Sequence, residues 1–271
     1  MWLTILGWCA LGLVGLMVLT WLISLPLRDA SIVDIVWGLT FVTVAWIAVA
    51  ARPDDLASSG SSTSSGRSLA LAVMVTVWGS RLAIHLAVRN LGHGEDPRYV
   101  SMRRRIGPRF WLVSLVSVFL LQGVLSLVVS LPVTLAAASS APFRWGVVEA
   151  LGLVLFGVGL FFETVGDLQL ARFKSDPSNA GKVMDRGLWR YTRHPNYFGD
   201  CCAWWGIFVV AVGGGGAIWW GVFGPIAMTV LLLRVSGVAL LERSIGKRRP
   251  EYADYIARTS SFIPRPPRPV R

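Results

Sequence analysis

The stretch from Arg186 to Asp200 concentrates side chains of the types that bind nucleotides. It combines three arginines with a histidine, an asparagine and four aromatic residues, and it leads into an apolar segment. Arginine binds phosphate through two parallel hydrogen bonds, aromatic rings stack on a purine or nicotinamide ring, and a helix N-terminus attracts an anion. The stretch is therefore predicted to bind a cofactor. A membrane-surface loop anchored by Trp and Tyr is the alternative, but it would not need such dense and varied polar residues.

Ionisable residues also lie inside segments that are otherwise apolar, where a charge is costly and usually serves a function. Arg81, His85 and Arg89 are spaced four residues apart, so they share one face of a helix. Snorkelling to the membrane surface accounts for Arg89 but not for Arg81, which lies about two turns deeper. We predict a functional cationic stripe here. Asp34 is predicted to handle a proton, because burial raises the pKa of a carboxyl group; capping a helix is the alternative role.

The apolar segments that carry these residues are predicted to be transmembrane helices. Only 15% of the 271 residues are charged, against about 25% in a typical soluble domain, and the charges crowd between runs long enough to span a bilayer. The predicted fold is all-α: a polytopic membrane protein with one transmembrane domain of about seven helices. The predicted helices lie near 3–25, 32–51, 69–90, 111–137, 145–170, 201–216 and 217–240. Four glycines, 213–216, would separate the last two, although one merged span is the alternative.

Lysine and arginine predict the orientation of the chain. They cluster after the third, the fifth and the last predicted helix, and with seven helices these segments all lie on one side, the cytoplasm. The N-terminus would then lie outside and the C-terminus inside, with residues 241–271 as a basic cytoplasmic tail and residues 58–66 as a flexible outer linker. The same rule accounts for the net charge of +11 without nucleic acid as a partner. Membrane lipids are the expected surroundings.

Neither a disulfide framework nor a metal site is predicted. Cys9, Cys201 and Cys202 fall in or beside apolar segments, and two of them are adjacent. The three histidines are scattered and lack the spacing of metal ligands.

Several motifs together resemble a family of membrane enzymes. Residues 193–197 resemble the Arg-His-Pro-x-Tyr signature of the steroid 5-alpha-reductase-like proteins, the sterol C14 reductases and the isoprenylcysteine carboxyl methyltransferases. The wider pattern resembles the bacterial branch of the steroid 5-alpha-reductase superfamily, the domain-of-unknown-function 1295 group, over nearly the whole chain. That pattern comprises Ser31-Ile32-Val33-Asp34-Ile35-Val36-Trp37-Gly38, Trp78-Gly79-Ser80-Arg81-Leu82, Glu95-Asp96-Pro97-Arg98-Tyr99 and Gly166-Asp167-Leu168-Gln169. The signature alone does not separate a reductase from a methyltransferase.

The resemblance implies NADPH bound from the cytoplasm and a lipid substrate that enters from the bilayer, in a bacterial inner membrane. The cofactor-binding positions that it transfers are Asp167, Arg172, Arg186, Tyr191, Asn196, Tyr197 and Asp200. The remaining predicted cofactor contacts are Arg81, Arg98, Lys174, Trp189, Arg193 and His194. The eukaryotic steroid reductases hold a substrate ketone with a Gln-Glu pair and a Tyr, which this sequence lacks, and Asp34 and Trp37 lie in the corresponding helix.

The predicted reaction is hydride transfer from NADPH to an electron-poor C=C bond of a lipid, in a site that excludes water. Asp34, Glu95 or Tyr99 would supply the proton to the neighbouring carbon or carbonyl oxygen, and Trp37 completes the predicted catalytic set. A steroid, a fatty acyl chain and an isoprenoid are all compatible substrates.

Two other functions share some of these features. A methyltransferase that uses S-adenosylmethionine on a lipid or a lipidated thiol would carry the same signature, but its cofactor has no phosphate and needs fewer of the arginines between Arg186 and Arg193. A lipid-binding or transport protein without catalytic activity would line a path through the whole membrane with polar residues. Here the polar residues concentrate in the predicted cytoplasmic half, which favours an enzyme.

Overall fold

The computed structural model describes residues 1–52, 62–235 and 252–268. Within these ranges the regular structure is helical, and a single isolated β-bridge joins Thr192 to Ser260. The chain divides into two compact units. The first unit comprises Met1–Glu149 and Val210–Gly224, and the second comprises Ala150–Val209 and Pro225–Arg271.

In the described part of the chain, six helices are long and apolar enough to cross a membrane. They span Trp2–Leu27, Ile32–Ala50, Gly66–Asn90, Pro97–Val129, Val147–Ser175 and Gly216–Arg234. The prediction of an all-α polytopic membrane protein is confirmed. The helix predicted at 201–216 is α10 (Pro195–Val212), which is not among these six. A 3₁₀ segment, η5 (Gly216–Val222), separates it from the helices that follow.

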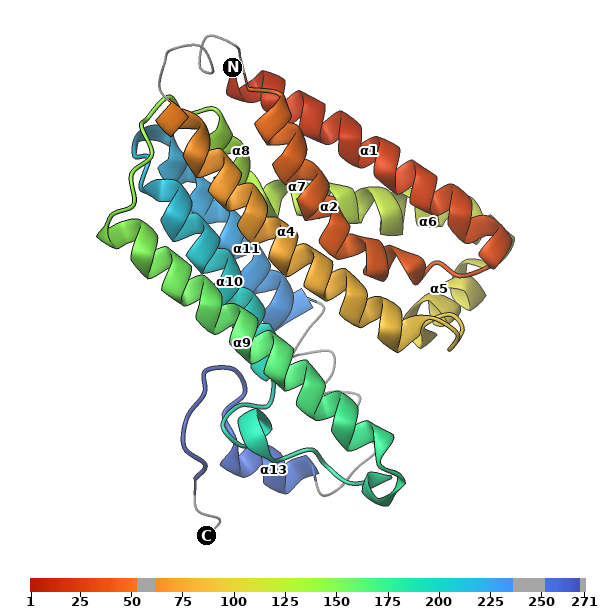
Figure 1. Ribbon diagram of the computed structural model, residues 1–271. Coiled ribbons are helices and arrows are strands. Elements are labelled where there is room, and N and C mark those ends of the chain that lie inside the picture. The colour runs from red at the N-terminus through yellow and green to blue at the C-terminus, as the bar shows by residue number, and fades with distance from the viewer. Residues whose placement is uncertain (53–61, 236–251, 269–271) are drawn as a thin grey trace. The chain divides into compact units, whose positions relative to one another are not determined.

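The first unit contains α1 (Trp2–Leu27), α2 (Ile32–Ala50), α4 (Ser62–Asn90) and several shorter helices. Helices α2 and α4 lie side by side (Figure 1). A Cβ on Gly38 would collide with the carbonyl oxygen of Gly79, and a Cβ on Gly79 with that of Gly38. Small residues let helix backbones approach closely inside a membrane. The glycines of the Trp37-Gly38 and Trp78-Gly79 motifs are therefore needed for this packing.

The helix predicted at 111–137 is a succession of shorter ones. It comprises α6 (Phe110–Ser114), the π-helical turn η2 (Leu115–Leu120), α7 (Leu121–Val129) and α8 (Leu131–Ala137). The break between α7 and α8 has a local cause, because Pro132 occupies the first turn of α8, where a missing N–H does no harm.

Two segments that were predicted to be irregular are helical. Residues 97–106, placed in a loop by the sequence, form α5 (Pro97–Ile106), because Asp96 accepts a hydrogen bond from the Arg98 backbone N–H as its N-cap and Pro97 follows directly. Residues 62–66, predicted as the end of a flexible linker, are the first five residues of α4. The remaining linker residues, the end of the last predicted helix, and residues 241–251 and 269–271 of the predicted tail lie outside the described ranges.

The second unit is built on α9 (Val147–Ser175), whose residues from 150 onward belong to it, and on α10. Glycines form the seam between these helices: a Cβ on Gly159, Gly199 or Gly206 would lie 2.5–2.6 Å from a backbone atom of the facing helix. The unit also contains η3 (Pro177–Asn179), η4 (Gly187–Arg190), the π-helical turn η6 (Leu231–Val235) and most of α11 (Phe223–Val230).

The last described segment, residues 252–268, folds back onto the loop that precedes α10. It begins with α13 (Tyr252–Arg258) and continues without regular secondary structure. The Arg193 N–H donates to the Ser260 carbonyl at 2.9 Å, and the Arg265 N–H donates to the Tyr191 carbonyl at 2.9 Å. The sequence predicted a basic tail here, whereas residues 252–268 are packed and hydrogen-bonded.

Candidate functional site

In the first unit, a carboxylate, a phenol and a guanidinium meet at the start of α2. The Tyr99 hydroxyl donates to Asp34 Oδ1 at 2.7 Å, and Arg98 Nη2 donates to Asp34 Oδ2 at 2.6 Å. Tyr99 is buried, at 6% exposure. The structure therefore brings together two of the predicted proton-handling residues and one of the predicted cofactor contacts.

Helices α5 and α7 hold this group in place. Because Arg98 and Tyr99 lie in the first turn of α5, the Asp96 cap fixes both, and Asp96 also accepts from Arg98 Nε at 3.0 Å. Gln122 on α7 donates from Nε2 to the Tyr99 hydroxyl oxygen at 3.4 Å. The phenol thus has a donor on one side and a carboxylate acceptor on the other. This arrangement can orient a proton on the Tyr99 oxygen.

Glu95 lies in a different network. Its two carboxylate oxygens accept from Arg103 Nε at 3.0 Å and Nη2 at 2.7 Å, and the Ala30 backbone N–H donates to Oε1 at 2.9 Å. Burial alone would raise the pKa of Glu95, but the hydrogen bonds from Arg103 and Ala30 and the charge of Arg103 lower it below its usual value. Glu95 is therefore held ionised and joins the start of α2 to α5.

The other predicted residues of this unit lie on α2 and α4. Trp37 packs edge-on against Phe41, with ring centroids 5.1 Å apart, and Phe41 packs in the same way against the buried Trp78 at 5.2 Å. Arg81 is half-buried on α4, whereas Arg89 is exposed near its end. Arg81 is thus less exposed than Arg89, and the function of the cationic stripe stays a prediction.

In the second unit, the loop from Arg186 to Arg193 is fixed to α9. The Leu188 backbone N–H donates to Gln169 Oε1 at 2.9 Å, and Trp189 Nε1 donates to the Gly166 carbonyl at 3.0 Å. The Tyr255 hydroxyl of α13 donates to the Trp189 carbonyl. Burial raises the pKa of the Tyr255 hydroxyl above its usual value, which keeps this donor protonated. Trp189 is buried and serves as an internal anchor of the loop.

Arg193 holds the C-terminal segment. Its Nη1 donates to the carbonyl oxygens of Ile256 at 3.0 Å and Thr259 at 2.6 Å, and the side chain is 7% exposed. The Thr192 hydroxyl donates to the Phe262 carbonyl at 2.8 Å. The arginine of the Arg-His-Pro signature therefore ties the loop to the last turn of α13 and to the residue that follows it.

The next residues of the signature form a polar layer at the start of α10. The His194 and Tyr197 rings stack, with centroids 5.4 Å apart and planes 6° from parallel. Asn196 Nδ2 donates to Asp167 Oδ1 on α9 at 3.2 Å. Of the remaining predicted cofactor contacts in this unit, Asp200 is half-buried and the following are exposed: Arg172, Lys174, Arg186 and Tyr191.

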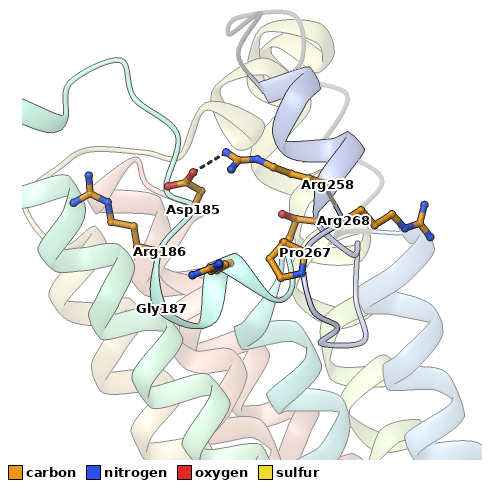
Figure 2. Close-up of a pocket in the computed structure, with 8 residues that line it drawn as sticks. Asp185, Arg186, Gly187, Arg258, Pro267 and Arg268 are labelled. Atoms are coloured by element: carbon orange, nitrogen blue, oxygen red, sulfur yellow. Dashed lines mark hydrogen bonds and ion pairs between the residues drawn. The ribbon is translucent and has the colours of Figure 1, made fainter. Parts of the chain in front are cut away.

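A cationic cavity of about 450 Å³ opens between this loop and the C-terminal segment (Figure 2). It is lined by Asp185, Arg186, Gly187, Arg190, Arg258, Thr259, Pro267 and Arg268. Four of the lining residues are arginines and one is an aspartate, so the lining carries a net positive charge. Guanidinium groups bind phosphate through paired hydrogen bonds, and the cavity therefore fits a phosphate-bearing ligand.

Most of the cavity lining was missed by the sequence prediction. Arg186 was predicted, but Asp185 and Arg190 stand in or beside the same motif and were not. Arg258 and Arg268 come from the predicted tail, and Arg258 is 73 residues from the Asp185 that it contacts. The only local signal for that segment is the pair Tyr252 and Tyr255, whose spacing is typical of one buried face of a short helix.

Comparison with known proteins gives a family match and a partial relative. The family described as DUF1295, protein of unknown function, matches residues 20–259. A protein named probable O-methyltransferase ustE, from Ustilaginoidea virens, is 44% identical over 48 residues, which cover 18% of this chain and 17% of that protein. No solved structure matches the chain.

Proposed function

The chain belongs to the DUF1295 family, and from this premise we propose that it is a membrane-embedded, NADPH-dependent reductase of a C=C bond in a lipid. The family and the partial relative support an enzyme. The lipid would be steroid-like, a fatty acyl chain or an isoprenoid, reaching the protein from the bilayer. In this proposal the cofactor loops face the cytoplasm of a bacterial inner membrane, with the N-terminus outside.

The cationic cavity of the second unit is the observation that carries the choice of cofactor. NADPH bears a pyrophosphate and a further phosphate, and four arginines, Arg186, Arg190, Arg258 and Arg268, are among the residues that line this cavity. S-adenosylmethionine bears no phosphate and a positive sulfonium, so such a lining would repel it. Bound NADPH would supply the hydride, and the arginines would hold its phosphates.

The Asp34–Tyr99 pair supports the assignment of the proton donor. Reduction of a C=C bond adds a hydride to one carbon and a proton to its neighbour or to the conjugated carbonyl oxygen. We assign that proton to the Tyr99 hydroxyl, which donates to Asp34 in the absence of substrate and would turn to the acceptor atom when substrate binds. The Gln122 amide would support the phenolate that remains, and a water molecule would return the proton to it. Arg98 keeps the Asp34 carboxylate in position.

A methyltransferase is the second candidate, and the name of the partial relative favours it. In that case the loop from Arg186 to Asp200 would bind S-adenosylmethionine, and a lipid oxygen or thiol would accept the methyl group.

The two candidates are separated by ligand binding to the purified protein in detergent. At 100 times its dissociation constant, NADPH should stabilise the protein by about 2.7 kcal/mol, which a thermal unfolding experiment detects. Arg190→Gln should weaken this effect, because Arg190 lines the cavity, and Arg144→Gln, an exposed arginine of the first unit, should not. Stabilisation by S-adenosylmethionine instead of NADPH would replace the reductase with the methyltransferase.

The proton donor is tested by Tyr99→Phe. This variant should still bind NADPH but should oxidise it roughly 10²- to 10⁴-fold more slowly with a lipid acceptor, the usual contribution of a general acid. A steroid 3-oxo-4-ene and unsaturated lipid extracts are the first acceptors to try. Wild-type turnover in Tyr99→Phe would remove Tyr99 from this role.

A further inference from the structure

A second cavity of about 290 Å³ adjoins the cationic cavity in the second unit. It is lined by Phe173, Asn179, Lys182, Val183, Asp185, Arg186, Asp254 and Arg258. Asp185, Arg186 and Arg258 line both cavities. Arg258 Nη2 and Asp185 Oδ2 are 2.7 Å apart, so an ion pair forms part of the wall between the two spaces (Figure 2).

The Arg258 guanidinium is only partly satisfied by this pair. Its Nη2 donates to Asp185, whereas its Nε–H is buried and has no hydrogen-bond partner among the described residues. A buried donor without an acceptor is unusual in a native protein. Figure 2 shows Arg258 reaching across towards Asp185, while Arg186 and Arg268 extend to opposite sides of the cavity. Arg258 thus combines an Nε–H without a described partner with an Nη2 that donates to a carboxylate at the cavity.

Asp185 is the only carboxylate among the described residues that line the larger cavity. It accepts a hydrogen bond from Arg258 Nη2, a donor of the kind that binds phosphate. The pair is open to solvent, with the Arg258 and Asp185 side chains 38% and 33% exposed. Exposed ion pairs are weak, whereas a phosphate oxygen that accepts from arginine forms a strong, charge-assisted hydrogen bond. A phosphate can therefore displace Asp185, whereas an uncharged ligand forms no charge-assisted hydrogen bond that would offset the loss of the pair.

We propose that Asp185 is a specificity-determining residue: it occupies Arg258 until a phosphate group of the ligand displaces it, and so it selects phosphate-bearing ligands. The proposal rests on the proposed function, in which the cationic cavity binds the cofactor phosphates. Arg258 then binds phosphate directly, and Asp185 sets how much negative charge the ligand must carry.

The test measures the affinity of inorganic pyrophosphate for the purified full-length protein, by calorimetry in magnesium-free buffer. Asp185→Asn should bind pyrophosphate roughly five- to tenfold more tightly, because a competing charge is removed. Arg258→Gln should bind it roughly tenfold more weakly. If Asp185 only positions Arg258 for the ligand, Asp185→Asn will weaken binding instead, and the proposal is overturned.

Two controls separate this competition from a general change of charge. In the Arg258→Gln background, Asp185→Asn should no longer tighten binding, whereas a long-range charge effect would persist there. Asp254→Asn removes an equal charge from a residue that lines only the smaller cavity, and it should change the affinity less than about twofold. Equal tightening by Asp254→Asn would contradict the proposal. If Arg258→Gln does not fold, Arg258→Lys replaces it, because lysine keeps the charge but lacks the paired N–H donors of the guanidinium.

The same measurements distinguish a failure of the role of Asp185 from a failure of the proposed reductase function. Binding of pyrophosphate and NADPH by the wild-type protein, with weaker binding in Asp185→Asn, rejects the role of Asp185 and leaves the reductase in place. Absence of pyrophosphate binding in the wild type and in Asp185→Asn rejects both the role of Asp185 and the cavity as a phosphate site.

Discussion

The Arg67–Glu149 ion pair of the first unit and the Asp185–Arg258 ion pair of the second differ in how much water reaches them. Arg67 and Glu149 are 3.1 Å apart with side chains 3% and 7% exposed, whereas Asp185 and Arg258 are closer, at 2.7 Å, but about one third exposed. The shorter contact is the less important one for stability, because solvent screens it. The buried pair, Arg67–Glu149, therefore serves the stability of the fold, whereas the exposed pair, Asp185–Arg258, can be reached by a ligand.

The residues around Arg67 are also packed to hold a buried charge. Its guanidinium lies over the Phe143 ring, 5.3 Å from the centroid. A Cβ on Gly213 would collide with Glu149 Oε1, and a Cβ on Gly214 would lie 2.6 Å from Arg67 Nη1. These two glycines therefore make room for the buried charges, in addition to ending α10, which was the only role that their sequence indicated.

The largest effect is expected for Glu149→Gln, which removes the carboxylate that pairs with the buried Arg67 among the described residues. Loss of one partner of a buried pair costs about 3–5 kcal/mol, and we expect this decrease in the free energy of unfolding in detergent. Replacement of both residues by Met should restore much of the stability, since no charge is then buried. A loss below about 1 kcal/mol in Glu149→Gln would show that water or another group reaches Arg67.

A smaller effect is expected for Gly214→Ala. The new methyl group would press on Arg67 Nη1 and on Ile218 Cδ1, 2.6 and 2.7 Å from the Cβ position, and overpacking of this kind costs about 1–3 kcal/mol. Gly157→Ala in α9 is the matched control, because no atom lies within 4 Å of its Cβ position and alanine favours a helix. Equal stability of the two variants would mean that the ion pair shifts without cost.

The sequence predicted the parts of the fold that depend on continuous apolar runs. Helices α1 and α2 begin and end within two residues of the predicted 3–25 and 32–51, because a bilayer sorts residues by polarity. Helices α5 and α13 were missed, because both are short and rich in charge, and their stability comes from a cap and from tertiary contacts. The division of this segment into α6, η2, α7 and α8 could not be predicted either, because its residues are almost uniformly apolar and give no signal for where a helix ends.

The candidate site was predictable only where its residues lie in motifs that the sequence itself singles out. Asp34 and Tyr99 were both proposed as proton-handling residues, and the structure places them 2.7 Å apart. Arg193 and Trp189 have the right chemistry for a ligand, but their hydrogen bonds go to backbone carbonyls of the protein itself. Arg258 and Arg268 reach the cavity through long-range folding of the C-terminal segment, which no local pattern reveals.

The Glu95–Arg103 pair gives an intermediate case with a pH dependence. Because the pKa of Glu95 is lowered in the folded protein, its contribution is present above the unfolded pKa of about 4.3 and is lost as the pH falls through the folded pKa. We expect Glu95→Gln to cost about 1 kcal/mol at pH 7. The difference in melting temperature between wild type and Glu95→Gln should shrink as the pH falls below about 4. A difference that stays constant would show that Glu95 does not titrate in this window.

The smallest effect on stability is expected for Asp185→Asn, the same chemical change as Glu149→Gln but at an exposed pair. Water can solvate Arg258 when its partner is lost, because more than a third of that side chain is exposed. The free energy of unfolding should change by about 1 kcal/mol or less, measured under the conditions used for Glu149→Gln. A decrease as large as that of Glu149→Gln would show that Asp185 fixes the C-terminal segment, and the difference between the buried and the exposed pair would no longer separate structure from binding.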